Sequence, residues 1–213
     1  MTISSSLDRR AALKARHRLA ILDAADELIR ERGNPRFSVD ELADRADVAR
    51  RTVFNHFASL DDIVITACTR LLTGTVDEFR ALTGPTLVTN GNRLELLSEF
   101  AAGMSRIDLP AVISYLFGVL YNDGADGRSH SVLQDVFTRT TEQMSLEVAS
   151  RSVEADRLEV EIFVGSLVNG LGVIARHWME STGGALDEAS RTLWSDLLER
   201  LIATVRSGYG PTD

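Results

Sequence analysis

Cysteine and lysine are both scarce in this sequence. Cys68 is the only cysteine, so the chain cannot form an intrachain disulfide, which fits a reducing compartment. Its thiol is expected to pack as a small apolar side chain on a helix rather than to react. Lys14 is the only lysine among 23 cationic residues, a preference for arginine that we interpret mainly as the mark of a GC-rich genome.

Long apolar runs are also lacking. No run approaches the roughly 18 residues that a membrane-spanning helix needs. The segment from Met1 to Arg18 is polar and then basic, without the apolar stretch of a signal peptide. The sequence therefore predicts a soluble, cytoplasmic protein with no membrane partner.

Charge is divided unevenly along the chain. The net charge is −8, which by itself disfavours nucleic acid as a partner. Residues 1–60, however, carry 11 Lys/Arg against 9 Asp/Glu, whereas residues 61–213 carry 12 against 22. An acidic body behind a mildly basic N-terminal segment would repel DNA everywhere except at that segment.

Helical periodicity dominates the sequence, with no convincing strand alternation and no internal repeat. The pattern predicts an all-α fold of about nine helices, divided into a smaller domain at 1–58 and a larger one at 59–213. Apolar residues make up 44% of the chain, enough for a sizeable core. The helices are expected near 8–32, 38–46, 49–57, 60–82, 93–106, 109–120, 129–151, 153–180 and 186–207.

Local signals mark the ends of the first four helices. Gly33, followed by Asn34-Pro35, is typical of a helix stop. Ser38 and Glu41 have the spacing of a capping box, and Ser59 precedes two aspartates that suit a helix N-terminus. The second and third helices are thus short and separated by a tight turn at Asp47, which predicts a helix-turn-helix.

The third predicted helix, from Ala49 to Phe57, has a chemistry suited to base recognition. Arginine can bind guanine O6 and N7 with two hydrogen bonds, asparagine can bind adenine in the same way, and threonine can contact a thymine methyl. Val48, Val53 and Phe57 are spaced to pack inward. The exposed side then carries Arg50, Arg51, Thr52 and Asn55. A merely solvated polar face is the alternative for this pattern on composition alone.

A wider motif resembles the signature of the tetracycline-repressor (TetR) family. It consists of Phe37-Ser38-Val39-Asp40-Glu41-Leu42-Ala43, then Ala46-Asp47-Val48, then Thr52-Val53-Phe54-Asn55-His56-Phe57-Ala58-Ser59. The match covers roughly residues 10–65, and the helix count extends it to the whole chain. The resemblance implies a DNA-binding domain at 1–58 and an effector-binding and dimerisation domain at 59–213. It also implies a dimeric repressor of a palindromic double-stranded DNA operator. The implied DNA contacts are Ser38, Arg50, Arg51, Thr52, Phe54, Asn55 and His56.

The chain departs from the family pattern at four positions. Asp47 replaces a turn glycine but tolerates the left-handed conformation, so the turn is expected to survive. Ala49 removes a helix cap worth about 1 kcal/mol. Phe54 lacks the hydroxyl of the usual tyrosine, and Leu60 replaces a lysine that commonly contacts phosphate.

Two further features near the helix predicted at 49–57 have two interpretations each. His56 either donates to a DNA phosphate, as the resemblance implies, or packs at a helix end. The basic residues ahead of the first helix either form an arm that lies on phosphates or in the minor groove, or a solvated terminus. These are Arg9, Arg10, Lys14, Arg16 and Arg18.

The last two helices are expected to form the interface of a homodimer. Two apolar stripes run along the final helix, and one can face the protomer's own core while the other faces a partner. Ordinary core packing of both stripes is the alternative. The predicted interface residues are Gly165, Gly172, Leu193, Leu197, Leu201 and Val205.

The middle helices are expected to enclose a pocket for a small, mostly apolar effector. Its candidate lining residues are Phe100, Met104, Tyr115, Phe137, Met144 and Trp178, with Asn169 and His177 as polar anchors. For each residue singly, core packing is the favoured explanation. The sequence does not identify the effector.

Enzyme signatures are missing. The four histidines are scattered, with no zinc-binding His-Glu-x-x-His arrangement, no Gly-x-Ser-x-Gly elbow and no phosphate-binding loop. The loop at 122–127 resembles a calcium loop only faintly, because Leu133 stands where the twelfth-position glutamate belongs. We therefore expect no catalytic activity, cofactor or metal. The alternatives to a ligand-responsive repressor are an orphan DNA-binding regulator and a helical protein-interaction adaptor.

Overall fold

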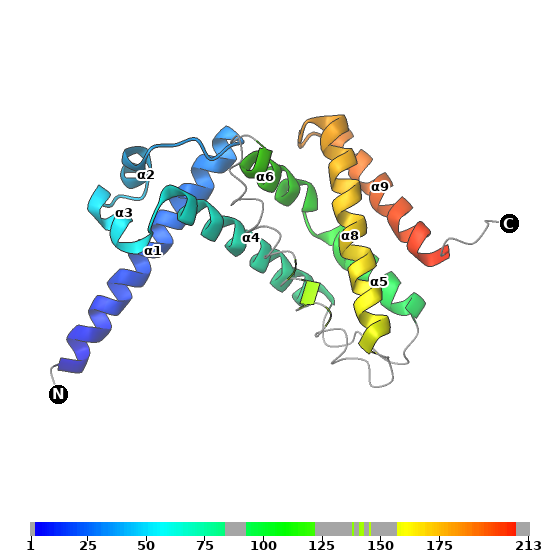
Figure 1. Cartoon of the computed structure of the whole chain (residues 1–213), viewed down its shortest axis with the longest axis horizontal. Helices are drawn as coiled ribbons and strands as arrows, with labels where there is room; N and C mark the ends of the chain where they lie inside the picture. Colours follow the sequence, from blue (N-terminus) through cyan, green and yellow to red (C-terminus); the bar gives the residue numbers. More distant parts are fainter. Residues whose placement is uncertain are drawn as a thin grey trace. The chain divides into compact units, whose positions relative to one another are not determined.

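The computed structural model describes residues 3–83, 93–121, 138, 141–142, 145 and 157–207, and every regular element in these ranges is an α-helix (Figure 1). The all-α prediction is therefore confirmed. Eight helices are described, close to the predicted number. The helix expected at 129–151 lies almost entirely outside the described residues.

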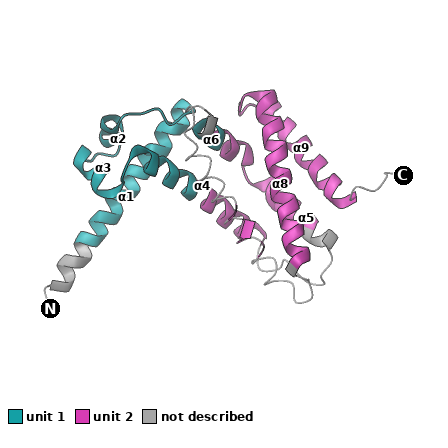
Figure 2. Ribbon diagram, in the orientation of Figure 1, with its two compact units in different colours: residues 1–70, 115–133 teal, residues 71–114, 134–213 magenta. Residues whose placement is uncertain are grey.

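The contacts divide the chain into two units, coloured separately in Figure 2. The first, unit 1, contains residues 1–70 and 115–133, and the second, unit 2, contains residues 71–114 and 134–213. Two helices contribute to both units, because α4 divides after Arg70 and α6 before Tyr115. The functional boundary at residue 58 stays a prediction.

Unit 1 is built around the C-terminal half of α1 (Ile3–Arg32). Packed with it are α2 (Val39–Arg45), α3 (Arg50–His56), the start of α4 (Leu60–Thr83) and the end of α6 (Leu109–Tyr121). The helix boundaries follow the local signals: Gly33 adopts φ +65° and its N–H donates to the Ile29 carbonyl, which ends α1. Core side chains of this unit include Ile21, Leu28, Ile29, Leu42, Val53, Phe57, Ile63 and Leu116.

Polar groups and a glycine join three helices of unit 1. Arg70 on α4 pairs with Asp23, at 2.7 Å, and with Asp26 on α1. The Tyr115 hydroxyl on α6 donates to the same Asp26 carboxylate at 2.6 Å. Gly118 lies so close to the Gly33 backbone that a Cβ there would overlap the Gly33 carbonyl oxygen. The end of α6 thus packs directly on the end of α1.

Unit 2 contains the rest of α4 and α6 together with α5 (Arg93–Arg106), α8 (Arg157–Thr182) and α9 (Glu188–Ser207). Trp178 is fully buried at its centre, and its indole N–H donates to the Ser190 carbonyl at 2.7 Å. The Trp194 ring packs edge-on against it with centroids 6.1 Å apart. Helices α8 and α9 lie side by side (Figure 1). The Leu201 side chain of α9 packs against the backbone of Gly170 on α8.

Helix α8 is unusually apolar. Leu158–Thr182 is long and apolar enough, at a mean hydropathy of 1.6, to cross a membrane by length and composition alone. The core helix of a soluble protein can meet the same criterion, and α8 does contribute Val164, Leu167 and Trp178 to the core of unit 2. The expectation that no apolar stretch reaches this length was too strict for α8.

Candidate nucleic-acid interface

Helix α2 is fixed at its start by the predicted capping box. The Ser38 hydroxyl accepts the Glu41 N–H at 3.2 Å, and Glu41 Oε2 accepts the Ser38 N–H at 2.9 Å. The Arg32 guanidinium, at 2.7 Å, and the Ser38 N–H together lower the pKa of Glu41 to about 2. The carboxylate therefore stays ionised at any physiological pH, and α2 keeps its cap.

A second ion pair holds the other end of α2 against α1. Arg45 contacts Glu31 at 2.8 Å and Glu27 at 3.2 Å, and these bonds raise the pKa of Arg45 and lower that of Glu31. Both pairs are exposed, so they orient α2 more than they stabilise the fold.

The turn between α2 and α3 has the geometry that the sequence predicts. Asp47 adopts φ +51°, the only positive value at a non-glycine residue in the described chain. The Val48 N–H then donates to the Ala43 carbonyl at 3.0 Å, which closes the turn. Ala49 begins α3 without a side-chain cap, as expected. The helix-turn-helix is thus formed with aspartate in the place of glycine.

Helix α3 divides into an inner and an outer face. Val53 and Phe57 are buried, whereas Arg50, Arg51, Phe54 and Asn55 are exposed. Thr52 and His56 are half-buried at the edges. The outer face therefore carries the donors and acceptors that base recognition requires.

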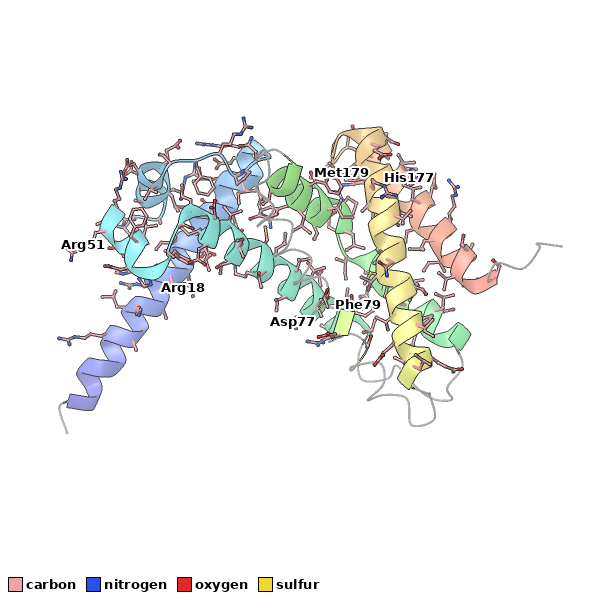
Figure 3. All side chains as sticks on the ribbon, in the orientation of Figure 1. Arg18, Arg51, Asp77, Phe79, His177 and Met179 are labelled. Carbon is pink, nitrogen blue, oxygen red and sulfur yellow. The ribbon has the colours of Figure 1, made fainter. Side chains whose placement is uncertain are left out.

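The two arginines of α3 differ in their surroundings. Arg50 Nη1 donates to both carboxylate oxygens of Asp40 on α2, at 3.0 and 2.9 Å. Arg51 forms no hydrogen bond or ion pair with any described residue, and Figure 3 shows its side chain directed away from the helices. Arg50 is thus held in place by Asp40, whereas Arg51 is not held by any described residue.

Side chains from α1 surround the end of α3. Arg18 donates to the His56 carbonyl at 2.9 Å and lies over the Phe57 ring, with its Cζ 4.2 Å from the centroid. The His17 ring packs edge-on against His56, with centroids 6.2 Å apart. Burial, followed by the charges of Lys14, His17 and Arg18, lowers the pKa of His56. His56 is therefore neutral at neutral pH in the free protein.

The N-terminal half of α1 carries a basic stripe. Arg10, Lys14, His17 and Arg18 recur with helical spacing on one face, in register with the buried Ile21 further along the helix. In Figure 1 this half of α1 extends beyond α3 as a continuous helix. The basic residues expected ahead of the first helix thus lie within α1, where Arg10, Lys14 and Arg18 share one face and Arg16 falls on another. The side chain of Arg9 lies outside the described residues.

The hydroxyl of Ser38 has a structural role in the cap of α2. It caps α2 and also lies 3.2 Å from Glu41 Oε2. The DNA contacts assigned to Ser38, Arg50, Arg51, Thr52, Phe54, Asn55 and His56 stay predictions, but all seven lie on the α2–turn–α3 segment. Sequence reasoning missed Asp40 and His17, because nothing local in the sequence links either one to α3.

The predicted pocket residues do not gather in one place. Phe100, Met104 and Trp178 lie in the core of unit 2, and Tyr115 is bonded to Asp26 in unit 1. Asn169 is exposed on α8 and donates to the Gly165 carbonyl of its own helix, and His177 is exposed beside Glu180 at 3.9 Å. Phe137 and Met144 lie outside the described residues. That these residues line a single pocket therefore stays a prediction.

A groove between α5 and α9 was not predicted. It encloses about 500 Å³ in unit 2 and is open to solvent. Among the predicted pocket residues, only Met104 lines it. Its floor consists of Met104, Ile107, Trp194, Leu198 and Ile202, and its rim includes Ser105, Glu199 and Arg206.

The two apolar stripes of α9 have different environments. Trp194, Leu198 and Ile202 are buried in the core of unit 2, whereas Leu193, Leu197, Leu201 and Val205 are only half-buried at its edge. On α8, Gly165 and Gly172 have open space where a Cβ would be. Exposed apolar side chains accompany them on that helix: Leu158, Ile162 and Val173.

Comparison with known proteins follows this geometry. Residues 21–67 match the sequence model of bacterial regulatory proteins of the tetR family. These residues run from the core of α1 through α2 and α3 into α4. Comparison with curated proteins gave no match.

Many solved structures share the fold, including the following three. A regulator from Mesorhizobium loti described as TetR-family superposes with a TM-score of 0.63 at 15% identity, over 90% of this chain and 97% of that one. A regulator from Aquifex aeolicus gives 0.51 at 18% identity, over 90% and 98%. The FadR repressor of Thermus thermophilus, solved with lauroyl-CoA, gives 0.51 at 21% identity, over 92% and 96%. The resemblance to the TetR family is thereby confirmed.

The surroundings of His56 predict that DNA binding strengthens as the pH falls. The predicted contact of His56 with a DNA phosphate would favour the imidazolium, so the pKa of His56 would be higher in a DNA complex than in the free protein, where it is lowered. Binding then takes up a proton, and affinity rises as the pH falls through the pKa of the complex. It levels off below the pKa of the free protein. The measurement is affinity for duplex DNA between about pH 8 and pH 6 at constant ionic strength.

Two variants test the assignment. His56→Gln should flatten the pH dependence, because it removes the group that takes up the proton. His177→Gln, on the exposed face of α8, should keep it. An unchanged slope in His56→Gln would show that another group carries the effect.

Proposed function

We propose that this chain, which has the fold of TetR-family transcriptional regulators, is a one-component repressor. It binds a partly palindromic operator as a homodimer and is released by a small, mostly apolar effector. The observation that carries the proposal is the exposed face of α3, held by a capped α2 and a closed turn and flanked by the basic stripe of α1.

Charge and geometry support DNA as the partner of this face. Lys14 and Arg18 from α1 and Arg51 from α3 offer cations on one side of unit 1, where phosphates on either side of a major groove would lie. The acidic remainder of the chain disfavours other approaches of DNA. Such a regulator acts in the cytoplasm and needs no cofactor or metal for this activity.

The DNA experiment is selection of a binding site from a random pool. The purified protein should select a site with two-fold symmetry, with half-sites about one helical turn apart or somewhat more. Arg50→Ala with Arg51→Ala should relax the preference at defined base positions by about 1–3 kcal/mol for each bidentate arginine–guanine pair removed. A matched control, Arg176→Ala with Arg200→Ala, removes the same charge from exposed sites in unit 2. An unchanged preference in the α3 double variant would refute the assignment.

The exposed faces of α8 and α9 support a homodimer. Ile162, with 60% of its surface exposed, and the glycines at 165 and 172 present an apolar, closely approachable surface on α8. The half-buried stripe of Leu193, Leu197, Leu201 and Val205 is available on the neighbouring helix. A symmetric partner would cover both, and a two-fold dimer places two α3 helices for two half-sites.

Charges placed on these faces should dissociate the dimer. Leu197→Asp with Leu201→Asp should yield monomers or misfolded chain, because the carboxylates would be buried without partners. Ile162→Asp separates these outcomes, since its exposed side chain tolerates charge in a folded monomer. Leu19→Asp on exposed α1 is the control. Light scattering and circular dichroism report mass and folding, and a monomeric wild type at micromolar concentration would overturn the proposal.

An apolar effector is supported by unit 2. The groove between α5 and α9 has an apolar floor, a polar rim and a volume in the range of ligand sites, about 300–1,000 Å³. The Thermus FadR repressor, similar in fold, was solved with lauroyl-CoA. The proposed site for this chain includes Met104, which both lines the groove and belongs to the predicted pocket.

The effector proposal predicts reciprocal coupling. An effector should weaken operator binding about 5- to 150-fold, and the operator should weaken effector binding by the same factor. Medium-chain fatty acids and lauroyl-CoA are the first probes, titrated against free protein and operator complex. Ala101→Trp, which fills the groove, should abolish the response and spare DNA affinity.

Other outcomes identify the alternatives. Equal effector affinities for free and DNA-bound protein exclude that compound as an inducer. DNA binding with no responsive compound indicates an orphan regulator. A protein that binds no DNA in a salt-dependent manner is better explained as a helical adaptor.

A further inference from the structure

Asp40 is an acidic residue next to α3, the predicted recognition helix, where the phosphates of DNA would repel its carboxylate. Asp40 is the second residue of α2, and its side chain is 65% exposed. Rather than facing solvent alone, its carboxylate receives two hydrogen bonds from Arg50 at the first position of α3. The pair links the two helices of the helix-turn-helix across the Asp47 turn.

The bonding pattern decides which part of Arg50 remains available. A guanidinium presents two edges with paired donors, one made by Nε and Nη2 and the other by Nη1 and Nη2. Both bonds to Asp40 come from Nη1. The Nε–Nη2 edge is therefore left intact, and this edge has the two parallel donors that match guanine O6 and N7.

A second contact restricts the same side chain. The Cζ of Arg50 lies 6.0 Å from the centroid of the Phe54 ring, one turn further along α3. Phe54 is itself 48% exposed, so the ring forms a platform on the outer face of the helix. Held by Asp40 on one side and Phe54 on the other, Arg50 loses little further conformational freedom when it binds.

Arg51, unlike Arg50, is not held by neighbouring side chains in the described part of the chain. It is exposed, and no carboxylate in the described part of the chain holds it. A free, mobile cation suits a phosphate, which accepts contact from many directions.

We propose that Asp40 is a positioning residue for base recognition: it orients Arg50 to read a guanine, while Arg51 binds phosphate. This inference rests on the proposed function and deepens it. The carboxylate has a second effect, because a negative charge near the DNA weakens binding to every sequence. Asp40 thus increases selectivity at the cost of general affinity.

The test compares site selection by the unaltered chain, four single variants and one double variant. Asp40→Asn keeps the shape of the side chain and removes its charge, and an exposed pair contributes little to folding, so the variant should fold. Asp44→Asn, also exposed on α2, removes the same charge without a described partner. Arg50→Ala and Arg51→Ala separate the two arginines.

The expected result has three parts. Asp40→Asn should lower the preference for guanine at one position of each half-site by about two- to fivefold, as expected for the loss of an exposed ion pair, while affinity for random DNA stays the same or rises. Asp44→Asn should leave the preference unchanged. Arg50→Ala should reduce the preference at the same position as Asp40→Asn, and adding Asp40→Asn to it should change nothing there.

Arg51→Ala should act differently. It should weaken binding to all sequences alike and reduce the salt dependence by about one phosphate contact. A loss of base preference in Arg51→Ala, with none in Arg50→Ala, would overturn the assignment of the two arginines.

The failures are distinguishable. A wild type that selects a site, with Asp40→Asn selecting the same site equally well, overturns the role of Asp40 and leaves the proposed function standing. A wild type that selects no site overturns the proposed function, and the role of Asp40 with it.

Discussion

The arrangement of the helices in unit 1 depends on the hydrogen bonds of the Asp26 carboxylate. This carboxylate accepts hydrogen bonds from Arg70 on α4 and from the Tyr115 hydroxyl on α6, and it stands on α1, the helix against which α2 and α3 pack. Burial and the adjacent carboxylate raise the pKa of Tyr115, so the phenol stays protonated and keeps donating. Burial likewise raises the pKa of the nearby Cys68 thiol to about 12. A half-buried carboxylate with these partners is costly to leave unpaired, so the three helices are held in one arrangement.

The contact of Gly118 with Gly33 adds a steric constraint to the polar one. Because no side chain intervenes, α6 meets α1 backbone to backbone at the point where α1 ends. The helix-turn-helix begins a few residues later, at Ser38. A displacement of the end of α6 would therefore move the end of α1 as well, because no flexible side chain lies between the two backbones to take up the change. This is the physical basis on which a signal could reach α2 and α3.

Local chemistry made most of unit 1 predictable. The capping box at Ser38, the stop at Gly33 and the left-handed Asp47 depend on neighbouring residues only, and all three are present. The pair of Asp40 with Arg50 was not predictable, because it depends on how two helices are placed after the turn. In unit 2, helical periodicity located the stripes of α9 but could not assign exposure on α8. That helix is apolar over several faces, so Asn169 and His177 were expected inward and are exposed.

The scarcity of lysine has a practical consequence. Lys14 is the only side-chain amine of the chain, it is exposed, and it stands on the basic stripe of α1 beside the end of α3. Cys68, the only thiol, is buried. An amine-reactive fluorophore or cross-linker would therefore modify one side chain, at the surface where a nucleic acid would lie, and a thiol reagent would leave the folded protein unlabelled. The chain thus carries one lysine label site at its candidate interface, in addition to the α-amine that any polypeptide has.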